Sequence, residues 1–475
     1  MCGIVGIINL SNFEEFEQIF LENMTNTMFH RGPDEWSTFK DSNIAFGHRR
    51  LKIIDLSVLG KQPMFDITNN VCITFNGEIY NYAEIKEELL KKGYQFRSNS
   101  DTEVILNSYI EYGIDCINKF IGMFAFAIYD KRNSKVFIAR DRLGIKPLYY
   151  SNFDGRLIFA SEIKAILKYP NFKYSPDMNG ISSYLSYRYP ISDFTLFDTV
   201  KSLLPGHYIE ISDGKTKIRQ YWELPINEKN EDLGERHYIE NIRKLFESSV
   251  KYRMISDVPI GAYLSGGLDS SAVVAIMSKF SNEPVKTFTI GFDEEGFNEF
   301  DYAKQVANYY KTKHYEIVLS SDDYIDNMVK LIGYKDAPLG VPNEPALHVM
   351  SKELKKYITV VLSGEGSDEI FGGYGRIFRS PYDYIRLKEL EKDNNLNDNS
   401  IIKLLRENLS KKYGNKQLNS ELAHFLHNYG YLSWADKEAF MSQDMTDSLK
   451  KDEVLDSIFA GHFSKIEKSD IINSI

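Results

Sequence analysis

The chain has 475 residues, which suggests two or three domains. Its formal charge of −10 argues against nucleic acid or an anionic membrane surface as the main partner, and leaves small anionic substrates open. The N-terminus MCGIVGIINL has no basic region, and no apolar run approaches ~18 residues, so neither a signal peptide nor a transmembrane helix is predicted. The chain is therefore expected in the cytoplasm. Three cysteines make no disulfide framework, and we expect Cys72 and Cys116 to be buried apolar residues.

The first part of the chain mixes strands with helices. A buried strand is predicted at 3–10 and a helix at 13–29. Further strands are predicted at 44–47, 51–56, 71–75, 124–129, 135–140, 147–150 and 157–160, with helices at 83–92 and 103–112. The polar, charged stretch 212–236 is predicted to link a first domain at 1–211 to a second at 237–475.

The second part alternates strands with helices of 10–15 residues. After a helix at 237–254, strands are predicted at 259–264, 285–292, 314–319 and 357–362, and helices from about 270, at 299–310 and at 345–356. This alternation predicts a doubly wound parallel sheet. From 383 onward the pattern is helical and interrupted, and the low-complexity stretch 391–400 is predicted as a solvated loop.

Cys2 is a candidate nucleophile. The small residue Gly3 after it favours removal of Met1, which would leave a thiol and a free α-amine on one residue. An α-amine has a pKa of roughly 7.7–8.0, so it can take the thiol proton as histidine does in a Cys-His pair. Position alone is weak support for this role, and the surrounding motifs are needed to strengthen it.

Several motifs follow one another in the first domain: MCGIVGI, HRGPD (30–34), HRRLKIID (48–55), NGEIYN (76–81), SDTEVI (100–105), GMFAFAIYD (122–130) and RDRLGIKPLYY (140–150). Together they resemble the glutaminase domain of asparagine synthetase of the glutamine-hydrolysing type. The resemblance implies an αββα sandwich of the N-terminal-nucleophile type. Glucosamine-phosphate synthase and the amidotransferase of purine synthesis share the N-terminal cysteine, but HRGPD and NGEIYN favour asparagine synthetase.

The resemblance implies a role for each matching residue. Cys2 attacks glutamine, Asn76 and Gly77 stabilise the oxyanion, and the glutamine-binding residues are Arg50, Leu51, Ile53, Ile54, Asn76, Gly77, Glu78 and Asp101. Without the resemblance, Asn76-Gly77 would be interpreted as a hairpin turn, and the charged residues as solvated surface groups. We expect His30 and His48 to be loop or core histidines rather than ligands.

Two further motifs each follow an apolar strand in the second domain. SGGLDSS offers backbone N–H groups at a helix N-terminus and lacks the Walker lysine, so it resembles the loop of ATP pyrophosphatases. The implied ATP-binding residues are Leu264, Ser265, Gly266, Gly267, Asp269, Ser270, Ser271, Ile290, Ser363 and Gly364. In the second motif, SGEGSDE, Glu365 is expected to act on the acyl-adenylate, while Asp269 and Asp368 are expected to hold Mg²⁺.

The predicted reaction is ATP-dependent amidation of aspartate to asparagine with glutamine as nitrogen donor, through β-aspartyl-AMP, releasing AMP, pyrophosphate and glutamate. ATP and Mg²⁺ are the expected cofactors, and the family suggests a homodimer. The resemblance weakens after Tyr374, and the family's later motifs do not occur before Ile475, so we expect a fragment or a shortened relative. Two alternatives stay open: a related amidotransferase acting on another carboxylate, and a truncated chain that is only a glutaminase or a non-catalytic subunit.

Overall fold

The computed structural model describes residues 1–10, 17–226, 231–294, 296, 298–375, 382–386, 388, 400–413 and 420–465. The chain divides into two compact units. The first comprises residues 1–176, 193–223 and 233–364, and the second comprises 177–192, 224–232 and 365–475. The predicted loop at 391–400 lies almost wholly outside the described residues.

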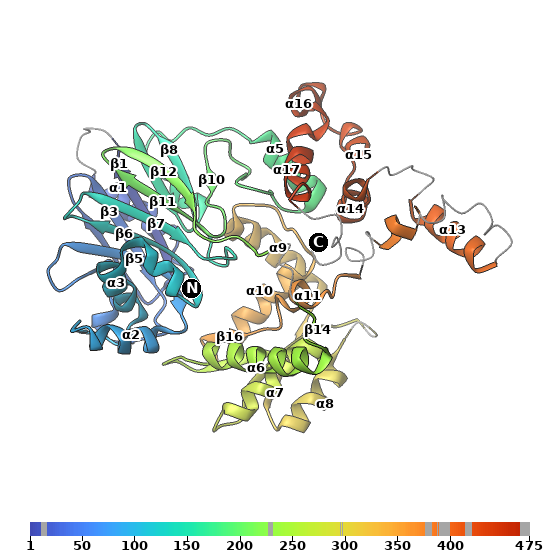
Figure 1. Cartoon of the computed structure of the whole chain (residues 1–475), viewed down its shortest axis with the longest axis horizontal. Helices are drawn as coiled ribbons and strands as arrows, with labels where there is room; N and C mark the ends of the chain where they lie inside the picture. Colours follow the sequence, from blue (N-terminus) through green and yellow to red (C-terminus); the bar gives the residue numbers. More distant parts are fainter. Residues whose placement is uncertain are drawn as a thin grey trace. The chain divides into compact units, whose positions relative to one another are not determined.

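Two six-stranded antiparallel sheets form the N-terminal part of the first unit (Figure 1). One sheet has the order β10-β8-β9-β1-β3-β2, with β10 at Lys201–Ser202, β8 at Tyr149–Phe153, β9 at Arg156–Ala160, β1 at Gly3–Asn9, β3 at Ile44–Arg50 and β2 at Glu35–Lys40. The other has the order β12-β11-β7-β6-β5-β4, with β12 at Lys215–Gln220, β11 at His207–Ser212, β7 at Lys135–Arg140, β6 at Gly122–Asp130, β5 at Val71–Ile79 and β4 at Met64–Phe65.

Alternating side chains of β1 explain the layers. Ile4 and Ile8 pack between the two sheets, against residues of the second sheet such as Ile138. Val5 and Ile7 face the opposite way, onto helices α1 (Gln18–Asn26) and α4 (Ile163–Leu167). This alternation buries both faces of the strand.

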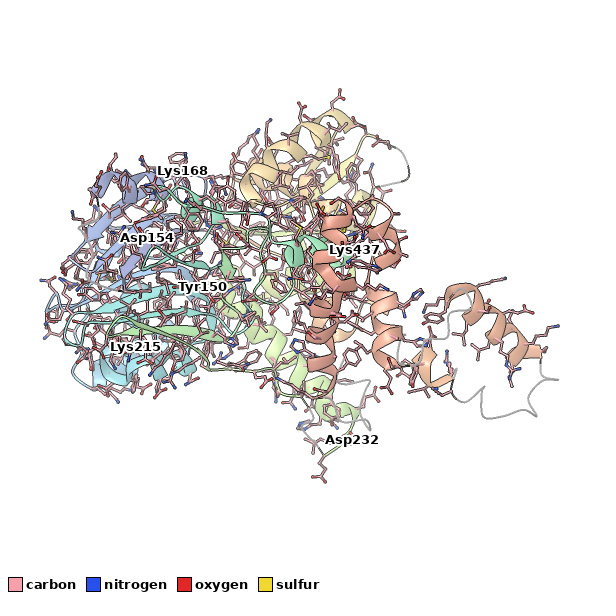
Figure 2. The ribbon with its side chains drawn as sticks, turned by 90° about the horizontal axis from the view of Figure 1, so that it is seen from above. Tyr150, Asp154, Lys168, Lys215, Asp232 and Lys437 are labelled. Carbon is pink, nitrogen blue, oxygen red and sulfur yellow. The ribbon has the colours of Figure 1, made fainter. Side chains whose placement is uncertain are left out.

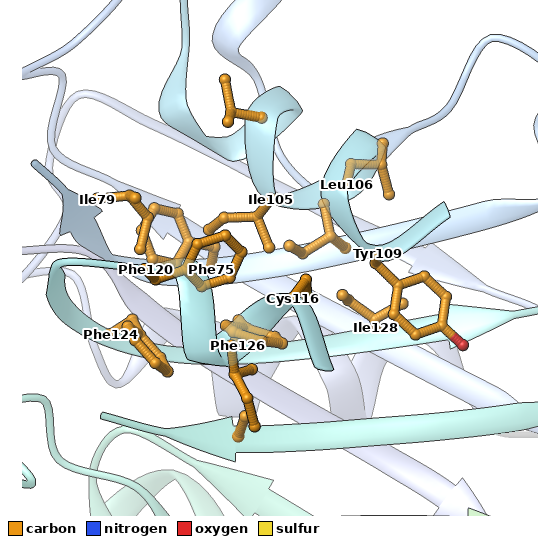
Figure 3. Packing of buried hydrophobic residues seen from close by; sticks show 14 of the residues in the cluster. Phe75, Ile79, Ile105, Leu106, Tyr109, Cys116, Phe120, Phe124, Phe126 and Ile128 are labelled. Carbon is orange, nitrogen blue, oxygen red and sulfur yellow. The ribbon is translucent and has the colours of Figure 1, made fainter. Parts of the chain in front are cut away.

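Helices α2 (Tyr82–Lys91) and α3 (Asp101–Tyr112) cover the outer face of the second sheet, and Figure 3 shows this cluster closely. It packs strand residues such as Phe75 and Phe126 against Ile105 and Leu106 of α3. Together the four layers confirm the predicted αββα sandwich.

The sheet contains strands that the pattern did not predict and lacks one that it did. Residues 51–56 form no strand, because side chains take up their backbone donors: Lys52 N donates to Asp34 Oδ2 at 2.9 Å and Asp55 N to Asp257 Oδ2 at 2.8 Å. Strand β12 lies inside the stretch predicted as a linker. Its sequence KTKIRQ has little apolar character, and it is held at the sheet edge by its antiparallel pairing with β11.

A four-stranded parallel sheet forms the rest of the first unit. Its order is β15-β14-β13-β16, with β15 at Lys313–Leu319, β14 at Lys286–Phe292, β13 at Ile260–Tyr263 and β16 at Val360–Leu362. The connecting helices are α7 (Leu268–Phe280), α8 (Phe300–Tyr310), α9 (Ser321–Lys335) and α10 (Asn343–Leu354), and α6 (Glu235–Arg253) precedes the sheet. The strand order confirms the doubly wound sheet. From β13 the chain adds β14 and β15 on one side and then returns to add β16, also parallel, on the other side of β13. Such folds bind ligands at this point, between β13 and β16. The pattern missed β2 and α9.

The second unit is helical. It contains α5 (Met178–Tyr187), α11 (Ser367–Phe371), α13 (Ser400–Tyr413), α14 (Glu421–Tyr429), α15 (Trp434–Glu438), α16 (Gln443–Leu449) and α17 (Glu453–Phe463). Lys437, labelled in Figure 2, is fully buried and pairs with Asp452, while its Nζ donates to Ser182 Oγ at 2.6 Å. This buried pair ties α5 to the C-terminal helices. Within the part of the chain that the structure describes, every helix is too short or too polar to cross a bilayer.

Candidate active sites

One cavity of about 340 Å³ brings together the residues predicted for glutamine chemistry. Cys2 and all eight predicted glutamine-binding residues line it: Arg50, Leu51, Ile53, Ile54, Asn76, Gly77, Glu78 and Asp101. The volume suits a small molecule. Residues from 2 to 101 therefore meet at one place, although their individual roles stay a prediction.

Cys2 lies directly before β1, and backbone contacts fix it. Leu51 N lies 3.4 Å from Cys2 Sγ as a donor, and the thiol in turn faces Leu51 O at 3.7 Å. Arg31 Nε donates to Cys2 O at 2.8 Å, and the guanidinium is held by Glu162 through Nη1 at 3.1 Å. The sulfur is therefore held at the edge of the cavity, beside a backbone N–H that can stabilise negative charge.

The amine next to this thiol lies in surroundings that disfavour its charged form. Burial, with a smaller contribution from the positive charges of Arg31 and Lys146, lowers the pKa of the Met1 α-amine to about 5, against an opposing effect of Cys2. The Met1 amine is therefore mainly neutral at pH 7. The Cys2 nitrogen is a backbone amide until Met1 is removed, so its role as general base stays a prediction.

Asn76 is a buried amide without partners. It lies in β5 opposite Ala125 of β6, and only 1% of it is exposed. Among the described residues, neither Asn76 Nδ2 nor Asn76 Oδ1 has a hydrogen-bond partner. Buried amides are nearly always paired, so an unpaired one that lines a cavity marks a place for a ligand. Because Asn76-Gly77 is in the middle of a strand, its interpretation as a hairpin turn is wrong.

Two carboxyl groups lie at the same cavity. Asp101 opens α3, accepts a hydrogen bond from Ile79 N at 3.0 Å, and has its pKa raised to about 6 by burial. Burial, together with the negative charge of Asp101, raises the pKa of Glu78 to about 8. Two buried carboxyl groups favour a cationic ligand, because its charge would offset the cost of ionising both.

The two neighbouring arginines have different surroundings. Arg50 lines the cavity, where its Nη1 bonds Glu35 Oε2 and Ser57 O, both at 3.1 Å. Arg49 is not among the lining residues; its guanidinium lies over the rings of Phe29 and Trp36. The structure therefore brings Arg50, rather than Arg49, to the cavity, as the sequence predicted.

His30, His48, Cys72 and Cys116 are not among the residues that line this cavity. His48 is fully buried, bonds Thr74 Oγ1 at 3.2 Å, and has its pKa lowered to about 3 by burial. His30 bonds Glu162 Oε1 at 2.9 Å. Cys72 and Cys116 are buried free thiols whose pKa burial raises well above the usual range, so they are structural.

Sequence reasoning assigned no role to several lining residues. They are Gly60, Gln62, Phe75, Ser100, Thr102, Met123, Lys146, Thr359, Val360 and Val361. Lys146 belongs to the motif RDRLGIKPLYY, so its motif was noticed but its place in the cavity was not. The last three belong to β16 and the residue before it, and no local signal links them to the first domain.

The loop between β13 and α7 has the features of an anion cradle. Gly267 caps α7 without a side-chain hydrogen bond, so the N–H groups of the first turn are not satisfied by a cap. Gly266 has φ +81°, and a Cβ there would lie 2.5 Å from Tyr302 Cβ and 2.7 Å from Ala303 N. Only glycine fits this turn. Ser271 Oγ is buried and has no partner among the described residues.

The loop after β16 approaches that turn. A Cβ on Gly364 would lie 2.9 Å from Asp269 Cβ and 3.0 Å from Ser270 N, so the two predicted ATP-binding segments are adjacent. Ser265 Oγ and Ser270 Oγ are 2.9 Å apart within the first loop. The predicted Leu264 is buried directly after β13, and Ile290 of β14 packs against a cluster that includes Phe288 and Met350.

Glu365 and Asp368 belong to the second unit; Asp368 lies in the first turn of α11, and Glu365 precedes the N-cap Gly366. The described residues contain no group of three His, Cys, Asp or Glu side chains arranged to hold a metal. Mg²⁺ is commonly bound by one or two carboxylates together with substrate phosphates, so Asp269 beside the loop fits such a shared site.

Comparisons with known proteins match two successive parts of the chain to two families. A model of the "Glutamine amidotransferase domain" matches residues 1–222, and one of "Asparagine synthase" matches residues 241–459. "Asparagine synthetase [glutamine-hydrolyzing] 1" of Bacillus subtilis (strain 168) is 39% identical over 396 residues, which are 82% of this chain and 61% of the relative. A provisionally named asparagine synthetase [glutamine-hydrolyzing] 2 of Methanocaldococcus jannaschii is 38% identical over 397 residues, 79% of this chain and 76% of the relative.

Among solved structures, glutamine phosphoribosylpyrophosphate amidotransferase from B. subtilis, complexed with ADP and GMP, matches with a TM-score of 0.36 and 15% identity. The match covers 66% of this chain and 65% of that chain. By the sequence comparison above, the chain spans about three fifths of the length of the Bacillus subtilis asparagine synthetase.

Proposed function

Because the chain belongs to the family of glutamine-hydrolysing asparagine synthetases, we propose that it uses glutamine as the nitrogen donor for an ATP-dependent amidation of aspartate. One observation carries the first half of this proposal: the unpaired buried amide of Asn76 lines the same cavity as the sulfur of Cys2. A thiol and an unsatisfied donor at one cavity suit attack on a carboxamide.

The glutaminase step begins when removal of Met1 exposes the Cys2 α-amine. That amine takes the thiol proton, and the sulfur attacks the side-chain carbonyl carbon of glutamine. The oxygen becomes an oxyanion that accepts hydrogen bonds from Asn76 Nδ2 and the backbone N–H of Gly77. The carbon–nitrogen bond then breaks, and the amine returns the proton to the leaving ammonia. Water hydrolyses the thioester and releases glutamate.

The same cavity can orient the rest of glutamine. The Arg50 guanidinium can bind the α-carboxylate, while Glu78 and Asp101 can bind the α-ammonium. The buried carboxyl groups become ionised when the ammonium supplies the opposite charge, which favours an α-amino acid over a simple amide.

Ammonia must stay unprotonated on its way to the second site. Met123, Val360 and Val361 give the cavity an apolar wall, and the last two belong to β16 of the parallel sheet. We propose that ammonia leaves along this wall, since an apolar surface offers no proton donors. The loop that follows β16 is the predicted nucleotide loop with Ser363 and Gly364.

We place the synthetase step at the carboxyl ends of β13 and β16, where the SGGLDSS and SGEGSDE loops begin. The N–H groups of the SGGLDSS turn bind the pyrophosphate portion of ATP, and Ile290 contacts the adenine. Asp269 and Asp368 would hold Mg²⁺, which would neutralise phosphate charge. The aspartate β-carboxylate attacks the α-phosphorus of ATP and displaces pyrophosphate. Ammonia then attacks the acyl carbon, with Glu365 near the adenylate, and AMP leaves.

One assay tests the proposal against its alternatives. Purified chain is incubated with glutamine, ATP-Mg²⁺ and aspartate, and glutamate, AMP and asparagine are measured together. Equal amounts of AMP and asparagine, both dependent on aspartate, support the proposal. Glutamate without AMP indicates a glutaminase alone, and AMP that forms without aspartate but with another carboxylic acid indicates a different acceptor.

A further inference from the structure

Lys146 is held by a rigid loop between β7 and β8. The Asp141 carboxylate accepts hydrogen bonds from three backbone N–H groups of this loop: Leu143 at 3.2 Å, Ile145 at 2.9 Å and Lys146 at 3.0 Å. It also accepts one from Phe124 N of β6 at 3.1 Å, which anchors the loop to the sheet. The Lys146 side chain therefore extends from a fixed point and lines the Cys2 cavity, with only 4% of the residue exposed.

The ammonium of Lys146 is buried without a carboxylate partner. Among the described residues, no carboxylate forms an ion pair or hydrogen bond with Lys146 Nζ, whose hydrogen bond goes to Met1 Sδ at 3.3 Å. A thioether is a weak acceptor, so it compensates poorly for burial of a charge. Burial, together with the Arg31 charge, lowers the pKa of Lys146 to about 8, against the opposing effects of Glu78, Cys2 and Asp141. The side chain is thus still mainly charged at pH 7.

The other cations near Cys2 already have partners. Arg50 is paired with Glu35, and Arg31 with Glu162 and the Cys2 carbonyl. Removal of Met1, as proposed above, would also take away the one acceptor that Lys146 Nζ has. The mature cavity would then contain an ammonium with no hydrogen-bond acceptor among the described residues, and Cys2 lines the same cavity.

We propose that Lys146 is a positioning residue of the Cys2 site, whose ammonium stabilises the negative charge that develops on the sulfur and on the substrate oxygen during attack. A buried charge acts strongly over short distances because little water screens it. The free-energy cost of burying the Lys146 ammonium is then offset by the negative charge that forms on the sulfur and the substrate oxygen during the reaction. The effect of Lys146 on a glutamine substrate rests on the proposed glutaminase function. Its electrostatic effect on the Cys2 sulfur does not depend on that function.

Two alkylating reagents separate this effect from activity. Neutral iodoacetamide and anionic iodoacetate both modify the Cys2 sulfur, and a nearby cation favours the anion. The second-order rate constants are measured by intact mass on the full chain after Met1 removal has been verified. We expect Lys146→Met to lower the iodoacetate-to-iodoacetamide ratio about 10-fold, and Lys146→Arg to restore most of it.

Lys135→Met is the matched control, because Lys135 is a partly exposed lysine of β7 that does not line the cavity. It removes the same charge and should leave the ratio unchanged. A ratio that is the same in wild type and Lys146→Met overturns the inference, as does an equal fall in Lys135→Met. If the ratio changes as expected but glutamine is not hydrolysed, the inference holds and the proposed function fails. Thermal melting shows whether each variant is folded.

Discussion

The backbone nitrogen of Leu51 lies 3.4 Å from the sulfur of Cys2, although 49 residues separate them in the chain. The contact exists because residues after β3 leave the sheet and turn their N–H groups toward other partners. A backbone donor to sulfur persists when the side chain at that position is changed. The role of Leu51 is therefore tested by removing its N–H.

Leu51→Pro should lower glutamine-dependent glutamate release about 10- to 100-fold, because a hydrogen bond to a charged atom contributes about 1.5–3 kcal/mol. Leu51→Ala keeps the N–H and should retain most of the activity. Steady-state glutamate release measures both. Equal losses in the two variants, at equal melting temperatures, would show that the side chain matters and the N–H does not.

Asn76→Ala should reduce kcat for glutamine about 10²- to 10³-fold, since it removes one oxyanion donor. Its free energy of unfolding should not fall by the loss of a hydrogen bond, because the Asn76 amide has no partner among the described residues.

Gln62 provides the contrast for Asn76. It lines the same cavity, but its amide bonds Phe75 N at 2.7 Å and Thr102 Oγ1 at 3.1 Å. Gln62→Ala should cost about 1–3 kcal/mol of stability in denaturant unfolding, since it leaves Phe75 N unsatisfied. If Asn76→Ala were the more destabilising change, its amide would have a structural role.

The affinity for glutamine should rise with pH between about 6 and 8.5. Burial raises the pKa of Glu78 to about 8 and that of Asp101 to about 6, and only their ionised forms attract the α-ammonium. KM for glutamine should therefore fall as pH rises. The fall is at most about tenfold for each pH unit over which one of these carboxyl groups is still mainly protonated. A KM that stays flat across this range would place the ammonium elsewhere.

The same shift predicts a change in stability for Glu78→Gln. The pKa of Glu78 is about 8 in the folded chain and 4.5 as the ordinary value. As pH rises from 4.5 toward 8, the unfolded chain loses this proton more readily than the folded chain, so folding becomes less favourable. Removing the acid should thus stabilise the chain more at pH 8 than at pH 5. Melting curves at the two pH values measure this, and a larger gain at pH 5 would contradict it.

Gly266→Ala should abolish AMP formation and spare glutaminase activity. A Cβ at φ +81° would press against Tyr302 and Ala303 and shift the turn, and a displacement of about 1 Å can cost 10²-fold in rate. Gly333→Ala in α9 is the control, because nothing lies within 4 Å of its Cβ position. Loss of glutamate release in Gly266→Ala would mean that the change has disturbed more than the nucleotide loop.

Local patterns predicted much of the fold. Short apolar runs such as that of β1 were visible as buried strands, because both faces of β1 pack on apolar layers. Strand β12 and the loop at 51–56 could not be predicted, because pairing at a sheet edge and backbone bonds to distant side chains leave no apolar period.

The candidate site was predictable in its composition but not in its geometry. The resemblance selected Arg50, Asn76, Glu78 and Asp101, and the fold brings them to one cavity. Lys146 was missed because a buried lysine is identical in sequence to an exposed one. Val360 and Val361 were missed because they reach the cavity from a strand far beyond Lys146 in the sequence.

The most direct test of the account concerns Cys2 itself. Intact mass establishes whether Met1 is removed, and glutamate release is then compared for wild type, Cys2→Ala and Cys116→Ala, the last being a buried thiol away from the cavity. We predict that Cys2→Ala abolishes glutamate release while Cys116→Ala keeps it. Glutamine hydrolysis that persists in purified Cys2→Ala would contradict the central claim.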